Sequence, residues 1–187
     1  MQGQISGTDG QRYELVGEIG RGGFGTVYRA KMRGSGGFEK TVALKVLNPE
    51  VAAEPGFAER LRDEARILGL LQHRAIVRVD DLIQLDGAWT VVMELVGGTD
   101  LKRIVGAGPV PVGPALEIIE EVASALGSAF SARGSTGNPV HLIHRDIKPS
   151  NIHLTAAGEV KVLDFGVARA EFQQRESVTR SLFFGSI

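Results

Sequence analysis

Four polar side chains late in the chain have the types and spacing needed to move a phosphoryl group. Asp146, Lys148 and Asn151 stand in one short segment, H-R-D-I-K-P-S-N, and Asp164 opens a later D-F-G segment. A carboxylate can accept a hydroxyl proton, an ammonium group can offset developing charge, and hard oxygens suit Mg²⁺. We predict Asp146 as the base and Lys148 as the cation beside it. Asn151 and Asp164 are the predicted metal ligands.

The residues around this segment are given other roles. Arg145 adjoins the predicted base and is expected to pair with a phosphate added to the downstream loop. His144 is expected to pack and hydrogen-bond rather than act as a base. His153 is expected to point outward between Ile152 and Leu154. No metal-ligand spacing joins the remaining histidines, so none is assigned a metal: His73, His141 and His153.

A glycine-rich segment near the start contains Gly20, Gly22 and Gly25 in the spacing G-x-G-x-x-G. Dinucleotide-binding proteins share this spacing, but in them the last glycine opens a helix. Here residues 26–31 alternate as a strand does, so the segment is predicted to join two antiparallel strands and to press its backbone onto phosphates. An ordinary hairpin turn is the alternative. The Walker-A pattern is absent, which argues against a P-loop nucleotidase.

Lys45 ends a short apolar strand, V-A-L-K, and a carboxylate is predicted to meet it. Glu64 lies about 20° from Phe57 on a helical wheel, inside the apolar stripe of the helix predicted for residues 57–71. A carboxylate on a buried helix face is costly unless a cation pairs with it. We therefore predict a Lys45–Glu64 pair that holds the ammonium near the α- and β-phosphates. A boundary glutamate whose end reaches solvent is the alternative.

The remaining pattern divides the chain at Val96-Gly97-Gly98. Before this joint the chain is mostly strands with one amphipathic helix, and after it helix patterns dominate until the motif segments. One long helix is predicted for residues 115–132, followed by a hairpin around residues 156–158. The expected fold class is therefore α+β, with a ligand between a β-rich part and a helical part. The apolar face of the long helix is predicted to consist of Ala115, Ile118, Ile119, Val122, Ala123, Leu126 and Phe130.

Composition narrows the class of protein. The chain has 187 residues, of which 43% are hydrophobic and 23% charged, so a sizeable core is expected. A formal charge of -1 gives no reason to expect a nucleic-acid partner, and no apolar run is long enough to span a bilayer. Cysteine is absent, which fits a reducing compartment. A cytoplasmic location with no membrane segment is expected.

Taken in order, these motifs resemble the eukaryotic-type serine/threonine protein kinase family, in the style of its bacterial members. The resemblance covers residues 13–187 and includes the glycine segment, V-A-L-K, the glutamate in R-D-E-A-R, V-V-M-E-L-V, H-R-D-I-K-P-S-N and D-F-G. It implies a bilobal fold with an antiparallel β N-lobe carrying one helix, at about residues 13–95. A hinge at about 94–98 and a mainly helical, incomplete C-lobe at about 99–187 complete it. Residues 1–12 are expected to be a flexible lead-in.

The resemblance also implies a nucleotide site. ATP and Mg²⁺ are the expected cofactors, and the partner is a protein substrate with a serine or threonine hydroxyl. Met93 is implied to be the gatekeeper, backbone groups of Glu94 and Val96 to bind adenine, and Asp100 to contact ribose. Residues implied to enclose the base are Val27, Ala43 and a residue near Leu154 or Leu163. Residues 167–186 resemble an activation loop, whose candidate phosphorylation sites are Ser177, Thr179 and Ser181, with Thr179 first.

The chain departs from the family pattern at its end. Residues 184–187 correspond to a point just before the family's A-P-E motif, and Ser186 stands where threonine is common. The expectation is therefore a truncated catalytic domain that binds Mg·ATP weakly and phosphorylates peptide poorly or not at all. The alternative is a non-catalytic nucleotide-binding or interaction module, a fragment of the pseudokinase type.

Overall fold

The computed structural model describes residues 4–6, 10–53, 55–134 and 137–165; for residues 4–6, 35, 51, 60 and 64 it describes the backbone alone. The chain divides into two compact units. The first contains Met1–Gln72 and Val77–Gly97, and the second contains His73–Ile76 and Gly98–Ile187.

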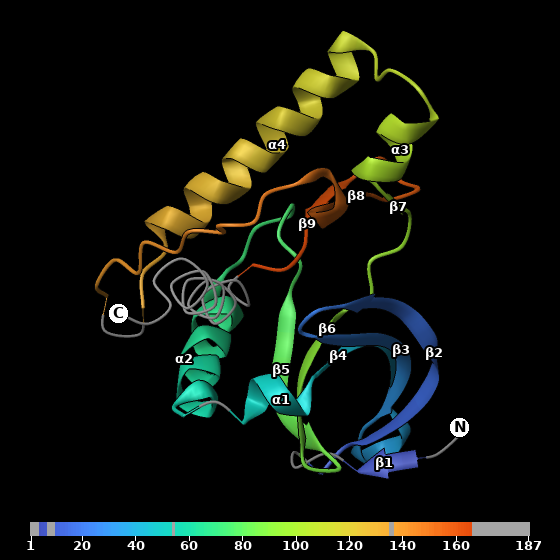
Figure 1. The fold of residues 1–187 in the computed structure, drawn as a ribbon, viewed down its shortest axis with the longest axis vertical. Helices are drawn as coiled ribbons and strands as arrows, with labels where there is room; N and C mark the ends of the chain where they lie inside the picture. Colours follow the sequence, from blue (N-terminus) through green and yellow to red (C-terminus); the bar gives the residue numbers. More distant parts are fainter. Residues whose placement is uncertain (1–3, 7–9, 54, 135–136, 166–187) are drawn as a thin grey trace, which may run out of the picture. The chain divides into compact units, whose positions relative to one another are not determined.

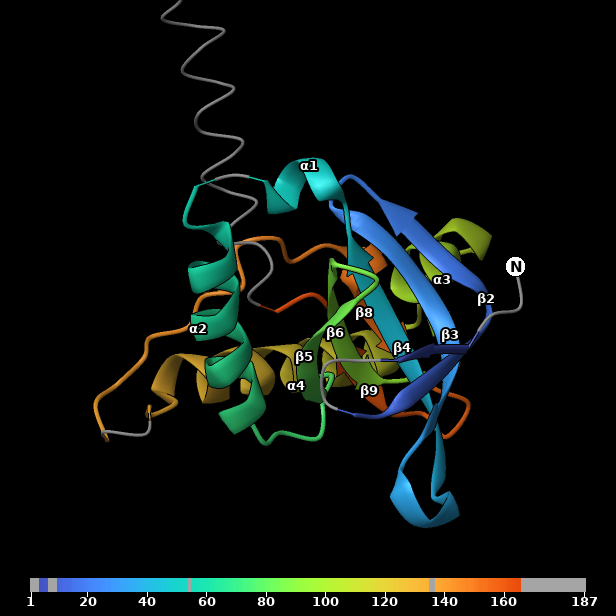
Figure 2. The ribbon, with the colours of Figure 1, turned by 90° about the horizontal axis from the view of Figure 1, so that it is seen from below.

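The first unit is built on a six-stranded antiparallel sheet with the order β1-β2-β3-β4-β6-β5 (Figure 1). The strand β1 corrects the expectation for the lead-in, because Gln4 pairs with Glu14 and extends the sheet by one strand. The β3–β4 hairpin carries the short helix η1 (Ser35–Gly37) at its tip and projects beyond the sheet (Figure 2). The strands are β1 (Gln4–Ser6), β2 (Arg12–Gly22), β3 (Gly25–Arg33), β4 (Glu39–Leu47), β5 (Val79–Leu85) and β6 (Ala88–Glu94).

One face of this sheet forms a closed core. Alternate residues of an antiparallel strand point to the same face, and here they are aliphatic or aromatic across five strands. Burying such side chains contributes about 1.5–3 kcal/mol each. The buried members of this core are Tyr13, Ala30, Val42, Leu44, Ile83, Leu85 and Val92.

Two helices follow β4 in the first unit: α1 (Pro49–Ala52), which was not predicted, and α2 (Phe57–Leu70). The helix α2 and its C-cap residue bury four apolar residues at helical spacing, while Ala65 in the same stripe is partly exposed. It packs on β5, and the Arg62 guanidinium lies 5.0 Å from the centre of the Trp89 ring on β6. The four buried residues are Phe57, Leu61, Leu68 and Leu71.

The described part of the second unit combines a small sheet with two α-helices, η2 and irregular segments. The antiparallel sheet has the order β7-β8-β9, and α4 lies alongside it (Figure 1). The segment His73–Ile76 joins this unit, because Val162 donates its backbone N–H to the carbonyl of Ala75 at 2.7 Å. The elements are β7 (Thr99–Asp100), α3 (Leu101–Ala107), α4 (Val112–Ser131), η2 (Pro149–Asn151), β8 (Ile152–Leu154) and β9 (Val160–Val162).

The buried side of α4 differs from the predicted one. Of the predicted face, Ile118 and Val122 are buried, whereas Ile119 is 62% exposed and Phe130 is 49% exposed. Apolar residues occur on more than one side of this helix, so helical periodicity could not select the side that packs. The buried stripe is Ile118, Val122, Ala125 and Ala129.

Candidate functional site

The second face of the large sheet brings together the side chains predicted to surround a nucleotide base. Val27 pairs with Lys45, and Ala43 pairs with Met93, in the registers of β3–β4 and β4–β6. Opposed residues share a face, and so do residues two apart on one strand. These four side chains therefore lie on one face, opposite the core that contains Leu44.

Lys45 is buried in this face, with 6% of the residue exposed. An ammonium group at such a position needs compensating polar partners or a ligand. The backbone of Glu64 lies in the third turn of α2, as predicted. Its side chain is outside the described set, so the Lys45–Glu64 pair stays a prediction.

The three predicted glycines differ in whether packing requires glycine at their positions. The strands β2 and β3 are joined at Gly22 and Gly25, which pair with each other, so the segment is a tight strand-to-strand connection as predicted. A Cβ on Gly25 would overlap the backbone carbonyl of Val46 on β4, so glycine is needed there for packing. A Cβ on Gly22 would meet nothing within 4 Å, and one on Gly20 would only touch Val27 at 4.0 Å. Packing within the described residues therefore does not explain Gly20 and Gly22, which leaves room for a ligand.

The segment predicted to bind adenine follows β6. Glu94 is the last residue of that strand, and its Oε1 accepts the backbone N–H of Arg78 at 3.0 Å. The Glu94 backbone N–H donates to the Arg78 carbonyl, also at 3.0 Å. Val96 lies beyond the strand and is partly exposed. The Glu94 side chain thus anchors the start of the segment to the backbone just before β5.

In the second unit, the predicted base and its neighbours form one hydrogen-bonded group. The Lys148 Nζ lies 2.5 Å from the Asp146 Oδ2. The Asn151 amide nitrogen donates to the Asp146 backbone carbonyl at 2.9 Å and to Oδ2 at 3.2 Å. Because the nitrogen of Asn151 is directed at Asp146, its Oδ1 is directed away, as a metal ligand requires.

His144 links this group to the D-F-G segment. It is 1% exposed, its Nε2 donates to the Leu163 carbonyl at 2.8 Å, and its Nδ1 accepts the Asp146 backbone N–H at 3.3 Å. These partners require the neutral tautomer with hydrogen on Nε2. The ring also meets Phe165 edge-on at 4.6 Å. The structural role predicted for His144 agrees with this geometry.

Asp164 and Arg145 both have positive φ angles, 59° and 64°. Such angles are uncommon outside glycine and mark a backbone held by its surroundings. The Leu163 N–H donates to the Asn151 carbonyl at 2.8 Å, which ties the segment before Asp164 to the one before β8. Asn151 and Asp164 thus come from two directly bonded segments, and their amide and carboxylate oxygens fit a hard cation such as Mg²⁺.

The small sheet separates two environments. Asp100 pairs with His153, and His153 pairs with Lys161, so these three side chains share one face. Asp100 also caps α3, since its Oδ1 accepts the Arg103 N–H at 2.9 Å. His153 is partly exposed on this face, in line with the outward orientation predicted for it, although its Nδ1 atom is buried.

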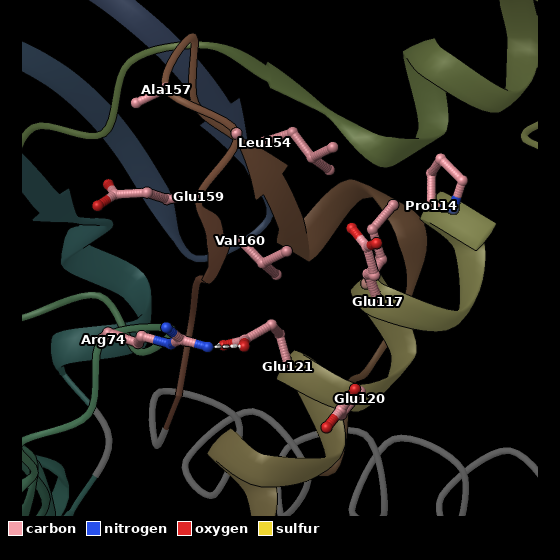
Figure 3. A pocket seen from close by; sticks show the side chains of 11 residues that line it. Arg74, Pro114, Glu117, Glu120, Glu121, Leu154, Ala157, Glu159 and Val160 are labelled. Atoms are coloured by element: carbon pink, nitrogen blue, oxygen red, sulfur yellow. Dashed lines mark hydrogen bonds and ion pairs between the residues drawn. The ribbon is translucent and has the colours of Figure 1, made fainter.

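A cavity of about 600 Å³ lies on the other face of that sheet, which carries Leu154 and Val160 (Figure 3). Glutamates of α4 and of the β8–β9 turn line it together with Arg74, which pairs with Glu121. Leu154 points into this cavity (Figure 3), on the face opposite His153. This placement gives no support to Leu154 as the residue enclosing a base.

The remaining expectations concern metal-binding groups, membrane-spanning helices and the activation loop. Within the described residues, no group of three or more His, Cys, Asp or Glu side chains could hold a metal ion. No described helix is long and apolar enough to cross a membrane. The predicted activation loop at residues 167–186, with Ser177, Thr179 and Ser181, lies outside the described residues.

The profile of the family described as "Protein kinase domain" matches residues 13–186. The chain belongs to the protein kinase family. It is 38% identical over 164 residues to "Tyrosine-protein kinase MasK" of Myxococcus xanthus, a match that covers 85% of this chain and 25% of that protein. It is 34% identical over 185 residues to "Probable serine/threonine-protein kinase PknB" of Lactococcus lactis, a match that covers 98% of this chain and 28% of that protein. The bacterial style of the motifs is confirmed by these relatives.

Solved structures confirm the kinase fold. The kinase domain of PknI from Mycobacterium tuberculosis superimposes with a TM-score of 0.70 at 30% identity, covering 87% of this chain and 62% of that one. A second PknI structure gives a TM-score of 0.67 at 33% identity, with 83% and 60% covered. The chain thus spans about a quarter of its curated relatives' length and about three fifths of the solved domains.

Proposed function

We propose that this chain provides the nucleotide site and the phosphoryl-transfer residues of a protein serine/threonine kinase that uses Mg·ATP. The observation that carries the proposal is the bonded group of Asp146, Lys148 and Asn151, joined through His144 to the segment of Asp164. It occurs in a chain that matches the kinase family over residues 13–186.

Each residue of the second unit has one task in this proposal. Asp146 accepts a hydrogen bond from the substrate hydroxyl, and takes its proton as the hydroxyl oxygen bonds to the γ-phosphorus and the bond to the β–γ bridging oxygen breaks. Lys148, on the same side as Asp146, offsets charge on the transferred group. Asn151 and Asp164 hold Mg²⁺, which supplies charge neutralisation at the phosphates when bound.

The first unit supplies the binding side of the same proposal. Lys45 reaches the α- and β-phosphates from its buried position, with Glu64 as its proposed partner. The backbone at Gly20 and Gly22 approaches the phosphates, because no Cβ stands in the way. The proposed lobe boundary, 94–98, carries the adenine contacts. ATP is a cytoplasmic metabolite, and we therefore propose a cytoplasmic location together with its use. The base-contacting residues proposed are Val27, Ala43, Met93, Glu94 and Val96, with Asp100 at the ribose.

Transfer of labelled γ-phosphate to a generic basic protein tests the proposal. We expect label on serine and threonine, abolished by Asp146→Asn and by Lys45→Met and retained in Lys31→Met. Lys31 is a suitable control because it is partly exposed and pairs with Glu39 on the β3–β4 hairpin. Label that survives Asp146→Asn would contradict the assignment.

Two alternatives make different predictions in the same assay. A non-catalytic nucleotide-binding module would bind Mg·ATP and transfer no label. The relative named as a tyrosine kinase raises the second alternative, a tyrosine acceptor. Phosphoamino-acid analysis separates the two acceptor classes, and D-I-K-P-S-N with Lys148 favours serine and threonine.

A further inference from the structure

In the second unit, Gly98 stands where the chain passes directly against the backbone at the end of β8. Its φ is 98°, in a region that glycine adopts without steric cost and other residues rarely adopt. A Cβ at this position would lie 1.9 Å from the Leu154 carbonyl oxygen and 2.8 Å from the Thr155 Cα. Conformation and space therefore both require glycine here.

The strand that follows Gly98 pairs with β8 at once. Thr99, the next residue, pairs with Leu154. Asp100 pairs with His153, and these two residues are the whole of β7. A displacement of the backbone at Gly98 therefore reaches Asp100 within two residues.

Asp100 in turn connects β7 with the segment of a proposed metal ligand. Its Oδ1 accepts the Arg103 N–H at 2.9 Å and so caps α3. The helix α3 packs on η2, whose last residue is Asn151. The other carboxylate oxygen of Asp100, Oδ2, is the atom that we expect to meet the ribose. The seating of β7 on β8 therefore determines where this oxygen stands within the second unit.

We propose that Gly98 is a positioning residue for nucleotide binding, because its missing side chain lets β7 lie close enough to β8 for Asp100 to meet a ribose hydroxyl. A Cβ would have to move about 1 Å or more from the Leu154 oxygen to reach an ordinary contact distance. The strand β7 would move with it, and a misplacement of about 1 Å is enough to lose an oriented contact. Gly98 acts through Asp100 and touches no ligand itself. This inference rests on the proposed function, because it requires ATP in the site.

Calorimetric titration of the 187-residue chain with the Mg²⁺ complexes of ATP and 2′,3′-dideoxy-ATP tests this role. Gly98→Ala is expected to weaken ATP binding about tenfold, the effect of one hydrogen bond to a charged group. It should weaken binding of the dideoxy analogue less than about twofold, because that analogue has no ribose hydroxyl to lose. Gly158→Ala is the matched control, since Gly158 also has a positive φ, 81°, but its Cβ meets nothing within 4 Å. Equal losses for the two nucleotides in Gly98→Ala, or no loss for ATP, would overturn the inference.

A double variant shows whether Gly98 acts through Asp100. Added to Asp100→Ala, Gly98→Ala should cost less than about twofold in ATP affinity, because the contact that it displaces is already absent. A further tenfold loss would show that Gly98 acts on another part of the site, and would overturn the proposed route.

Hydrogen exchange of the nucleotide-free chain reports the same displacement without ATP. Gly98→Ala should speed exchange of the Arg103 amide, which Asp100 caps, and Gly158→Ala should not. If Gly98→Ala does not fold, Gly98→Asn replaces it, because asparagine tolerates a positive φ and keeps the colliding Cβ. Failure of both variants to fold, or unchanged exchange at Arg103, would overturn this inference alone. Absence of ATP binding by the unaltered chain would overturn both this inference and the proposed function.

Discussion

The large sheet of the first unit and the segment from His144 to Phe165 in the second unit position side chains by different means. In the sheet, the regular register of β3, β4 and β6 determines on which face the Lys45 side chain lies. In the segment, Asp146 is oriented by side-chain hydrogen bonds and by neighbouring residues with positive φ. In the sheet, many backbone hydrogen bonds together fix the position of a side chain. In the segment, a few side-chain hydrogen bonds do so.

This difference determines how each region tolerates change. A single side-chain replacement in the sheet leaves the ladder of backbone bonds intact unless the new atoms collide with another strand. In the segment, removal of one imidazole breaks two contacts at once and leaves their partners buried. The following predictions test that contrast, from the largest expected effect to the smallest.

Gly25→Ala should produce the largest loss, because its Cβ would collide with the backbone carbonyl of Val46. We expect the free energy of unfolding to fall by about 3 kcal/mol or more, measured by urea denaturation. Gly22→Ala is the matched control, since its Cβ meets nothing within 4 Å, and should change stability by no more than about 1 kcal/mol. Equal effects of the two variants would contradict the packing reason given for Gly25.

His144→Leu should be the most damaging single change in the second unit's segment. It removes the bonds to the Leu163 carbonyl and the Asp146 N–H, at an expected cost of about 1–3 kcal/mol. Hydrogen exchange followed by mass spectrometry should show faster exchange of the Asp146 amide. Exchange at that amide as slow as in the unaltered chain would show that His144 does not hold the segment.

Asp80→Asn should have the smallest effect, confined to acid stability. Burial raises the pKa of Asp80, but hydrogen bonds from Lys40 and Arg78 outweigh it, so the pKa lies below its ordinary value of 3.8. The stabilisation is therefore present above that value and is lost as the pH falls through the lower folded pKa. At neutral pH the variant should lose less than about 1 kcal/mol, as partly exposed ion pairs do. As the pH falls below 3.8 and the folded-state carboxyl becomes protonated, the two proteins should converge in thermal melts; a constant difference would contradict this.

The sheet was largely predictable from sequence, because strand alternation reports which residues share a face. Lys45 is an example, and helical periodicity in the same way predicted the apolar face of α2. The side on which α4 packs was not predictable, since its apolar residues extend around the helix. The bond from His144 to the Leu163 carbonyl joins segments that are distant in the sequence, and no local pattern encodes it. Nor does a local pattern encode the burial of the His153 Nδ1.

The proposed function gives a residue of each region a part in binding Mg·ATP, and calorimetric titration of Mg·ATP tests this most directly. The variants are Lys45→Met from the sheet and Asp164→Asn from the segment. Asp86→Asn is the control, because Asp86 also has a positive φ, 48°, which asparagine tolerates. We predict that Lys45→Met and Asp164→Asn each weaken binding at least tenfold, about 1.4 kcal/mol, and that Asp164→Asn also abolishes the dependence on Mg²⁺. Full affinity in either variant would contradict the binding role proposed for the replaced residue.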